Sequence, residues 1–450
     1  MTTALKLDKI LASSRDENEI VASHGSKKLR WSEFTQNCSR YIQRFNKLPK
    51  GAWALHNSDA YEFACQLIAL WQLGNTVYLA ADTQAVSLQR LEKKVIGFIG
   101  DFPRQHRTST EEHRLGGTPN SSDHQDIAMV IFTSGSSGEP SEVPIRLAQF
   151  EAEAATLESQ FGHLVQGCSF ASTVSHQHLY GLTFSLLWPL LYKREFPCQR
   201  VHYLDELPTA FEHHKKTVLI STPSHLSRLP PNVDKNTIHH SSQVVLSSTA
   251  ALTAQDSKAA REYFQAEVIE IYGSSETGAI AWRNQAEQPL WAALPGIKIS
   301  NNNNKFKIKS PHSFSANWQN VNDEIEIADT NTFRLIGRRD RIAKVEGVRV
   351  SLNAIETRIC ELDSIIRAKV ISINSTGGLG AVIEVKPSVV LSSQSRRALT
   401  AKIKQHLLKE FVLPTIPKKW RFMERLPEDM QGKVRMSDLE SLFPRKESKQ

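Results

Sequence analysis

The sequence predicts an α/β protein with a large N-terminal domain of layered sheets and helices, which includes a β-subdomain, and a smaller α+β C-terminal domain. Three observations support this prediction. Short apolar runs alternate with segments of helical periodicity along most of the chain. Residues 295–336 are instead rich in short β-like runs, and the pattern changes again after Gly337. The 450 residues are enough for two or three domains at ~150 residues each.

The large domain is predicted from buried strands that alternate with helices. Apolar runs without internal alternation are typical of strands buried on both faces, as in parallel sheets. Helical periodicity separates several of these runs. The predicted strands are residues 127–133, 217–221, 243–247 and 267–272, and the predicted helices are residues 147–161 and 253–264.

The β-subdomain and the C-terminal domain follow in order. Alternating runs at residues 305–309, 324–328 and 333–336, with an Asn-rich turn at 301–304, indicate the β-subdomain. The segment beyond it is predicted to be a compact α+β unit of about a hundred residues, a size typical of a separate domain. Its predicted elements are a helix at 352–362, strands at 365–373 and 380–385, a helix at 395–411 and a strand at 420–423. We therefore place the domains at residues 1–338 and 342–450, with a hinge at 339–341.

Composition and charge exclude several classes of protein. No apolar run reaches the ~18–20 residues of a membrane helix, and the run at 184–192, interrupted by Pro189, is predicted to be a buried helix. The five scattered cysteines lack CxxC spacing, which argues against zinc and thioredoxin-like sites and suits a reducing cytoplasm. The net charge of +8 favours acidic partners. Lys and Arg are spread along the chain without an aromatic-basic motif, which argues against nucleic acid.

A Ser/Gly loop follows the first of the predicted strands. Glycines let several backbone N–H groups face one point, and hydroxyls add donors, so such a loop can cradle phosphates. It is not a Walker A loop, because no Gly-Lys-Ser/Thr follows. A flexible turn is the alternative interpretation. The loop consists of Thr133, Ser134, Gly135, Ser136, Ser137 and Gly138.

A second polar loop ends the predicted strand 267–272. Ligands of open α/β sheets gather beyond the carboxyl ends of strands, so the two loops are expected to face one cleft. Glu276 offers a carboxylate oxygen for Mg²⁺. The alternative is a helix start, with a serine as N-cap and Glu276 in the first turn. The loop residues are Tyr272, Gly273, Ser274, Ser275, Glu276, Thr277 and Gly278.

Two charged segments complete the pattern. Residues 337–349 are dense in Arg, Asp, Lys and Glu and lie at the proposed domain boundary, where a hinge that contacts ligand competes with a solvated turn. Residues 426–435 place Lys433 beside Gly432 near the C-terminus. A lysine beside a glycine is common, so this segment indicates a function only together with the two polar loops and the charged segment 337–349.

In this order and spacing, the four motifs resemble those of the adenylate-forming superfamily, which includes acyl- and aryl-CoA synthetases, peptide-synthetase adenylation domains and luciferases. The resemblance extends from Trp31 to Lys433. The features look closest to the small ligases of aryl polyene-type biosynthesis, which load an acid onto an acyl carrier protein. The resemblance implies a C-terminal domain that rotates about the hinge between two half-reactions.

The resemblance also implies roles for individual residues. The Ser/Gly loop is similar to the family's phosphate loop, and Tyr272–Thr277 is similar to its adenine-stacking and Mg²⁺-binding motif, with Glu276 as metal ligand. The remaining implied roles are Ser248 and Thr249 along the adenine and acyl pocket, Asp323 at the ribose hydroxyls (with Glu324 as a substitute), Arg338 at the ribose or phosphate, Asp340 at the hinge, Lys433 as catalytic lysine, and His178 near the acyl carboxylate.

The sequence departs from the family pattern at three places. Ser141 and Glu142 replace a Lys-Gly pair, which removes a cation near the triphosphate unless Arg146 substitutes. The Thr-Gly-Asp motif reads Val321-Asn322-Asp323. The Ser-Gly-Gly-Ala segment, at residues 247–250, has lost both glycines.

The predicted function is activation of a carboxylic acid with ATP and Mg²⁺ through an acyl-adenylate, followed by thioester formation on a phosphopantetheine thiol. The first expected acceptor is an acyl carrier protein that receives an aryl or acyl group. Free coenzyme A, as in acyl- and aryl-CoA synthetases, is the alternative. A degenerate nucleotide- or acyl-binding protein is the third possibility. A metal site at His176 and His178 competes with packed or pocket-lining histidines.

Overall fold

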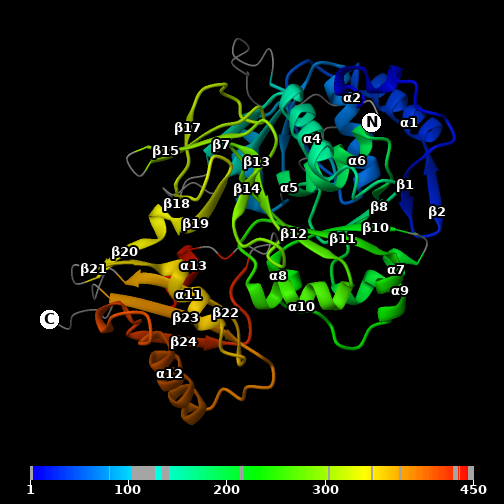
Figure 1. The fold of residues 1–450 in the computed structure, drawn as a ribbon. Helices are drawn as coiled ribbons and strands as arrows, with labels where there is room; N and C mark the ends of the chain where they lie inside the picture. The colour runs from blue at the N-terminus through cyan, green and yellow to red at the C-terminus, as the bar shows by residue number, and fades with distance from the viewer. Residues whose placement is uncertain are drawn as a thin grey trace. The chain divides into compact units, whose positions relative to one another are not determined.

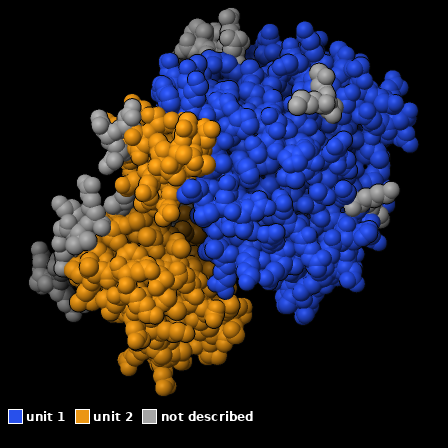
Figure 2. Space-filling view, in the orientation of Figure 1, with its two compact units in different colours: residues 1–298, 309–319 blue, residues 299–308, 320–450 orange. Residues whose placement is uncertain are grey.

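The structure is a computed structural model that divides into two compact units, Met1–Lys298 with Lys309–Gln319 and Ile299–Ile308 with Asn320–Gln450 (Figure 2). The predicted α/β architecture of several sheets and helices is confirmed. The described residues are 4–80, 82–103, 127–133, 141–212, 214, 216–302, 305–345, 348–373, 378–428, 434 and 436–443.

Unit 1 contains a five-stranded sheet of order β5-β3-β4-β6-β7. Four strands are parallel, and β7 pairs antiparallel with β6. The pairing of Thr133 with Ser141 makes β6 and β7 the two arms that flank the Ser/Gly loop. The strands are β3 (Ala52–His56), β4 (Thr76–Leu79), β5 (Gly97–Gly100), β6 (Met129–Thr133) and β7 (Ser141–Ile145), with helices α2 (Ala60–Gln72) and α3 (Ala85–Glu92) between them.

The second sheet of unit 1 carries the other polar loop. Strands β8, β10, β11 and β12 are parallel, and β13 and β14 continue the sheet antiparallel. Figure 1 shows α8, α9 and α10 on one side of this sheet. The elements are β8 (Ser169–Ser172), β10 (Thr217–Ser221), β11 (Ser242–Ser247), β12 (Glu267–Ser274), β13 (Gly278–Arg283), β14 (Trp291–Ala293), α7 (Leu207–Phe211), α8 (Pro223–Leu226), α9 (Lys235–Ser241) and α10 (Ala254–Phe264).

The remaining elements of unit 1 include the predicted buried helix at 184–192. It is built from α5 (Leu179–Gly181), a π-helical stretch Leu182–Leu187 and α6 (Trp188–Leu191), whose first turn accommodates Pro189. Among the described residues, no helix is both long and apolar enough to cross a bilayer. The other elements are a 3₁₀ stretch Leu7–Ala12, α1 (Trp31–Phe45), α4 (Leu147–Phe161), a 3₁₀ turn Leu204–Glu206 and a small sheet of β1 (Ile20–His24), β2 (Lys27–Arg30) and β9 (Phe196–Pro197).

Unit 2 has its own apolar core, in which helices α11 and α12 pack on the sheet β22-β23-β24. The predicted helix at 395–411 ends earlier, at Leu407, and the chain then turns toward Pro414. The elements are β15 (Lys298–Asn302), β16 (Lys305–Lys309), β17 (Gln319–Asn320), β18 (Asp323–Ile327), β19 (Thr332–Arg338), β20 (Ile342–Val345), β21 (Val348–Ser351), α11 (Leu352–Cys360), β22 (Ile365–Ile373), β23 (Gly378–Val385), α12 (Ser393–Leu407), a 3₁₀ turn Leu413–Thr415, β24 (Lys419–Met423) and α13 (Met436–Ser441).

The predicted hinge lies inside unit 2. Residues 339–341 form the 3₁₀ turn Arg339–Arg341 between β19 and β20. Compactness assigns residues 320–338 to the same unit as the C-terminal segment, whereas the sequence placed them in the large domain. The hinge role of Asp340 stays a prediction.

Candidate active site

The Glu276 loop is the tip of a β-hairpin. Strand β12 ends at Ser274, β13 begins at Gly278, and the two residues pair across the hairpin. The interpretation as a helix start is therefore wrong, because β13 pairs antiparallel with β12 where that helix would have begun. Glu276 is exposed and Thr277 is buried. A Cβ at Gly273 would lie 2.2 Å from the Gly278 carbonyl oxygen, so the hairpin requires glycine there.

Hydroxyl groups hold this turn from within. The Ser274 backbone N–H donates to Thr277 Oγ1 over 3.1 Å, and Thr277 Oγ1 donates to the Gly278 carbonyl over 3.0 Å. Ser310 Oγ donates to the Thr277 carbonyl over 3.1 Å. The backbone on both sides of Glu276 is thus fixed while its carboxylate faces solvent. Among the described residues, no basic side chain pairs with Glu276, so the carboxylate is available to a cation.

Beneath the turn lies the buried carboxyl group of Glu153, which belongs to helix α4. Glu153 Oε1 accepts a hydrogen bond from the Ala279 N–H at 2.7 Å. Thr183 Oγ1 approaches Oε2 at 3.5 Å. Burial raises the pKa of Glu153 to about 7, against these hydrogen bonds, which lower it. No lysine or arginine of the described residues pairs with it.

Whereas Glu153 binds the backbone N–H of Ala279, His312 binds the carbonyl group of Ala279. Its Nδ1 lies 2.8 Å from the Ala279 carbonyl, so Nδ1 carries the proton and donates. Nε2 then accepts from Thr156 Oγ1 over 3.0 Å. Burial lowers the pKa of His312 to about 4, which agrees with a neutral ring. Helix α4, which directly follows the strands that flank the Ser/Gly loop, therefore also fixes the base of the Glu276 turn.

Ser248 and Thr249 follow the carboxyl end of β11, the strand next to β12. Ser248 Oγ donates to the Ile271 carbonyl over 2.9 Å, which ties the two loops together. Thr249 is exposed and has a φ of +79°. A β-branched residue rarely adopts this left-handed conformation, whereas glycine does so readily. The backbone has thus kept a geometry suited to the glycine that the sequence has lost.

A buried ion pair supports the ring of Tyr272. Arg283 binds both oxygens of Glu270 at 2.8 and 3.0 Å, and its guanidinium lies 4.5 Å from the Trp291 ring. The Trp291 ring in turn packs on Tyr272 with centroids 5.5 Å apart. Glu270 Oε2 also accepts from the Leu252 N–H over 3.0 Å, which fixes the far end of the Ser248 loop.

The two histidines of the 175–178 segment have separate surroundings. His176 is buried, its Nε2 donates to the Asn57 carbonyl over 2.9 Å, and burial lowers its pKa to about 4. His178 Nδ1 accepts from the Tyr180 N–H over 3.3 Å at the start of α5. Among the described residues, no group of three His, Cys, Asp or Glu side chains could hold a metal ion. His176 is a packed histidine, and the predicted role of His178 near the acyl carboxylate stays a prediction.

The negative charge of Glu142, at the position where the family pattern has a Lys-Gly pair, is neutralised locally. The Lys94 ammonium lies 2.7 Å from the Glu142 carboxylate, and the Tyr78 hydroxyl donates to it over 3.3 Å. Burial and this carboxylate raise the pKa of Tyr78 to about 12. Arg146 is engaged elsewhere, since its guanidinium stacks 3.8 Å from the Phe314 ring and donates to the Phe314 carbonyl over 3.0 Å.

In unit 2, the two predicted ribose residues face each other. Asp323 and Arg338 occupy paired positions of the antiparallel hairpin β18–β19, and Glu324 pairs with Gly337. Asp323 is half-buried and Arg338 is exposed. Residues 15 positions apart in sequence are thus brought to one end of the hairpin. A carboxylate is suited to binding hydroxyl groups, and a guanidinium group is suited to binding a phosphate.

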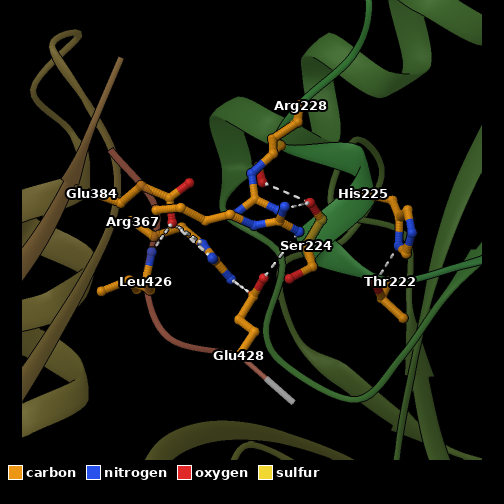
Figure 3. Close-up of polar contacts among 10 residues, drawn as sticks. Thr222, Ser224, His225, Arg228, Arg367, Glu384, Leu426 and Glu428 are labelled. Atoms are coloured by element: carbon orange, nitrogen blue, oxygen red, sulfur yellow. Dashed lines mark hydrogen bonds and ion pairs between the residues drawn. The ribbon is translucent and has the colours of Figure 1, made fainter. Parts of the chain in front are cut away.

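Lys433 lies outside the described residues, as do Ser134, Gly135, Ser136, Ser137 and Gly138. The chain that leads to Lys433 is described as far as Glu428. Figure 3 shows it held by a cluster of side chains of unit 2. Glu384 Oε2 accepts from the Leu426 N–H at 3.1 Å and from Arg367 Nη2 at 2.7 Å, and Arg367 Nη1 also binds Glu428.

Sequence reasoning did not find Glu153, His312, Glu270 or this arginine cluster. Glu153 and His312 act on segments far away along the chain: Glu153 binds the backbone 126 positions later, and His312 accepts from Thr156 across 156 positions. Glu270 and Arg367 bind side chains on neighbouring strands 13 and 17 positions away. No local pattern singled out Glu153, because the same helix also contains Glu151 and Glu158.

Comparisons with known proteins extend the picture. A model of the family described as AMP-binding enzyme matches residues 66–334. The chain is 27% identical over 191 residues to a 4-coumarate–CoA ligase of Cereibacter sphaeroides, which covers 41% of each chain, so less than half of that relative is matched. It is 25% identical over 354 residues to a D-alanine–D-alanyl carrier protein ligase of Staphylococcus epidermidis, or 69% of this chain and 70% of the ligase.

Among solved structures, ATP-bound MatB from Rhodopseudomonas palustris superposes with a TM-score of 0.77 at 16% identity, covering 98% of this chain and 99% of that one. This likeness shows the fold. The family match covers more than half of the chain and includes β6, the Glu276 hairpin and Asp323. The chain therefore belongs to the AMP-binding enzyme family, within the adenylate-forming superfamily that its motifs resemble.

Proposed function

We propose that this protein activates a carboxylic acid with ATP and transfers the acyl group to a phosphopantetheine thiol. The Glu276 hairpin is the observation that supports this most. It presents an exposed carboxylate at the carboxyl edge of parallel strands, fixed from below by Glu153 and His312. Ligands of α/β sheets bind at this edge. The two curated relatives named above are ligases of acids, one to coenzyme A and one to a carrier protein.

In the first half-reaction, the substrate carboxylate attacks the α-phosphate of ATP and pyrophosphate leaves. Positioning and charge stabilisation supply most of the catalysis in such a transfer. Tyr272, backed by Trp291, offers a face for the adenine, and Asp323 beside Arg338 is suited to the ribose. Lys433 would place its ammonium at the α-phosphate.

Mg²⁺ fits the Glu276 turn. Mg²⁺ prefers oxygen ligands, and the turn offers the exposed carboxylate of Glu276 in a segment whose neighbours Ser274, Ser275 and Thr277 carry hydroxyl groups. When bound, the ion supplies positive charge to the phosphates. Glu276 would be its protein ligand, and the role of the hydrogen bonds to Ala279 would be to hold the carboxylate in place.

In the second half-reaction, a thiol attacks the acyl-adenylate, the thioester C–S bond forms and AMP leaves. We propose an acyl carrier protein as the donor of this thiol, with an aryl or acyl acid as in aryl polyene-type systems. Coenzyme A carries the same phosphopantetheine arm and is the second candidate, supported by the coumarate–CoA ligase relative. His178, Tyr180 and Ser248 are the proposed lining of the acid pocket.

Acid-dependent ATP–pyrophosphate exchange tests the proposal. We expect exchange with at least one member of a panel of aromatic and aliphatic acids, and its loss in Glu276→Gln. Lys93→Ala, an exposed lysine on a different element, is the matched control and should exchange normally. Absence of exchange with every acid, in a protein that still binds ATP, would favour a degenerate binding protein instead.

A further inference from the structure

The net positive charge of the protein is concentrated in one segment of unit 2. Residues 396–421 contain eight Lys and Arg side chains and one acidic side chain, Glu410, so they carry +7 of the chain's net +8. Seven of the eight basic residues are exposed and Lys419 is half-buried. Although Lys and Arg are spread along the whole chain, elsewhere acidic residues nearly balance them.

Helix α12 arranges part of this charge on one face. Its opposite face, formed by Leu399, Ile403 and Leu407, is buried in the core of unit 2. Arg397 and Lys404 are seven positions apart and Leu408 follows four later, a spacing that puts all three on one side of a helix. The helical geometry continues through Leu408, whose N–H donates to the Lys404 carbonyl over 2.9 Å.

Exposed apolar side chains follow at and just beyond the C-terminal end of this helix. Leu408 is 48% exposed, Val412 54% and Leu413 69%. Arg397, Lys404 and Lys409 have no acidic partner among the described residues, while Glu410 is already engaged by Arg358 at 3.3 Å. We name Arg397, Lys404, Leu408, Val412 and Leu413 the α12 strip.

We propose that the α12 strip is the docking surface for an acidic acyl carrier protein, an inference that rests on the proposed function. A basic row with an apolar end complements an acidic helix that has an apolar end of its own. The two basic residues of the strip, Arg397 and Lys404, are seven positions apart, about 10 Å along the helix axis.

Two other occupants fit less well. A membrane-bound amphipathic helix inserts its apolar face, but that face of α12 is already buried in the core. A nucleic-acid surface usually interleaves basic and aromatic side chains. The α12 strip contains no aromatic side chain, and Trp420, the nearest tryptophan in the sequence, packs on the core of unit 2. Both are retained as outcomes of the test.

The test uses the full-length protein with a purified phosphopantetheinylated acidic acyl carrier protein, and with free pantetheine as a second thiol. In Arg397→Glu/Lys404→Glu, the KM for the carrier should rise about tenfold or more, and the dependence of this KM on salt should weaken. ATP–pyrophosphate exchange and transfer to pantetheine should be unchanged. Leu413→Ser should raise the KM for the carrier while keeping its salt dependence.

The matched control is Lys47→Glu/Lys93→Glu, which changes the net charge equally at exposed lysines elsewhere. An unchanged KM in the α12 variant, or an equal rise in the control, would refute the docking surface. So would a protein that adenylates an acid but transfers it only to coenzyme A, and this result would leave the proposed activation step intact. The strip would be assigned to another partner if the wild-type protein bound phosphatidylcholine–phosphatidylserine vesicles or single-stranded DNA, the α12 variant lost this binding, and the KM for the carrier were the same in both proteins.

Discussion

Two buried carboxyl groups, one in each unit, hold the backbone near a predicted catalytic residue, and they are stabilised in different ways. Glu153 of unit 1 is 6% exposed and binds the Ala279 N–H beside the Glu276 turn. Glu384 of unit 2 is 1% exposed and binds the Leu426 N–H at the start of the segment that leads to Lys433. Glu384 has Arg367 as a partner, whereas Glu153 has only hydrogen bonds to neutral groups.

The difference shows two solutions to the cost of burying a carboxyl group. Without a counter-charge, burial favours the protonated form, and the pKa of Glu153 is raised to about 7. With a counter-charge, the carboxylate stays ionised as part of a salt bridge. The pKa of Arg367 is raised in return, because its bonds to Glu428 and Glu384 outweigh the effect of burial, which lowers it. The contribution of Glu153 to the unfolding free energy of unit 1 should therefore depend on pH. The contribution of Glu384 to that of unit 2 should instead depend on the presence of its partner Arg367.

The largest effect is expected from Arg367→Met, which removes the arginine that binds both Glu384 and Glu428. We expect a loss of about 3–5 kcal/mol in the free energy of unfolding of unit 2, measured by urea denaturation. Arg367→Met/Glu384→Gln should recover part of this loss, since it also removes the buried negative charge that Arg367 binds. A loss below about 1 kcal/mol in the single variant would mean that the cluster behaves as a surface pair.

The next effect is the pH dependence due to Glu153. Its pKa is about 7 in the folded protein, against the ordinary glutamate value of 4.5 in the unfolded chain, so the folded state holds this proton more tightly. The stabilisation is present below about pH 4.5 and is lost as the pH rises through 7, an amount of roughly 3 kcal/mol. His176 and His312, with lowered pKa values, act in the opposite direction at lower pH.

The contribution of Glu153 is isolated by subtracting the unfolding free energies of Glu153→Gln from those of the wild type across this pH range. Glutamine can still accept from the Ala279 N–H, and both histidines are common to the two proteins. The difference should fall as the pH rises. A difference that does not vary with pH would show that Glu153 is ionised throughout and has a charge partner after all.

The smallest effect is expected from a single neutral hydrogen bond in the same turn. Ser310→Ala removes the donor to the Thr277 carbonyl and should cost about 1 kcal/mol of unfolding free energy. It should also raise the Mg²⁺ concentration needed for half-maximal exchange, because the backbone beside Glu276 is held less firmly. Ser315→Ala is the control, at a half-buried position of the same segment whose hydroxyl accepts from the Asn317 N–H and does not reach the Glu276 turn. Equal Mg²⁺ requirements in the two variants would argue that the turn does not depend on this bond.

The sequence was sufficient to locate the strands at or next to Tyr272, Ser248 and Asp323, with ends that differ by at most two residues from the observed ones. Those features depend on local periodicity and on residues close together in the chain. The hairpin at Glu276 was ambiguous, because Ser, Glu and Thr suit a helix start as well as a tight turn, and only the pairing of β13 decides between them. Helix α12 was predicted too long, since the end at Leu407 has no glycine signal.

The supporting side chains could not be predicted. Thr156 and His312 meet across 156 positions, and Arg146 reaches the Phe314 carbonyl across 168. Such contacts depend on how helix α4 packs against the segment 310–314, which no local pattern specifies. The buried position of Glu153 has no sequence signal either, because an acid within a helix normally indicates an exposed face.

The division of labour between Glu276 in unit 1 and Lys433 in unit 2 is the central claim, and one variant tests it most directly. Lys433→Ala should lose acid-dependent ATP–pyrophosphate exchange and yet convert a supplied acyl-adenylate to thioester at the wild-type rate. Adenylate formation at a normal rate in this variant, or equal loss of both half-reactions in a folded protein, would contradict the account.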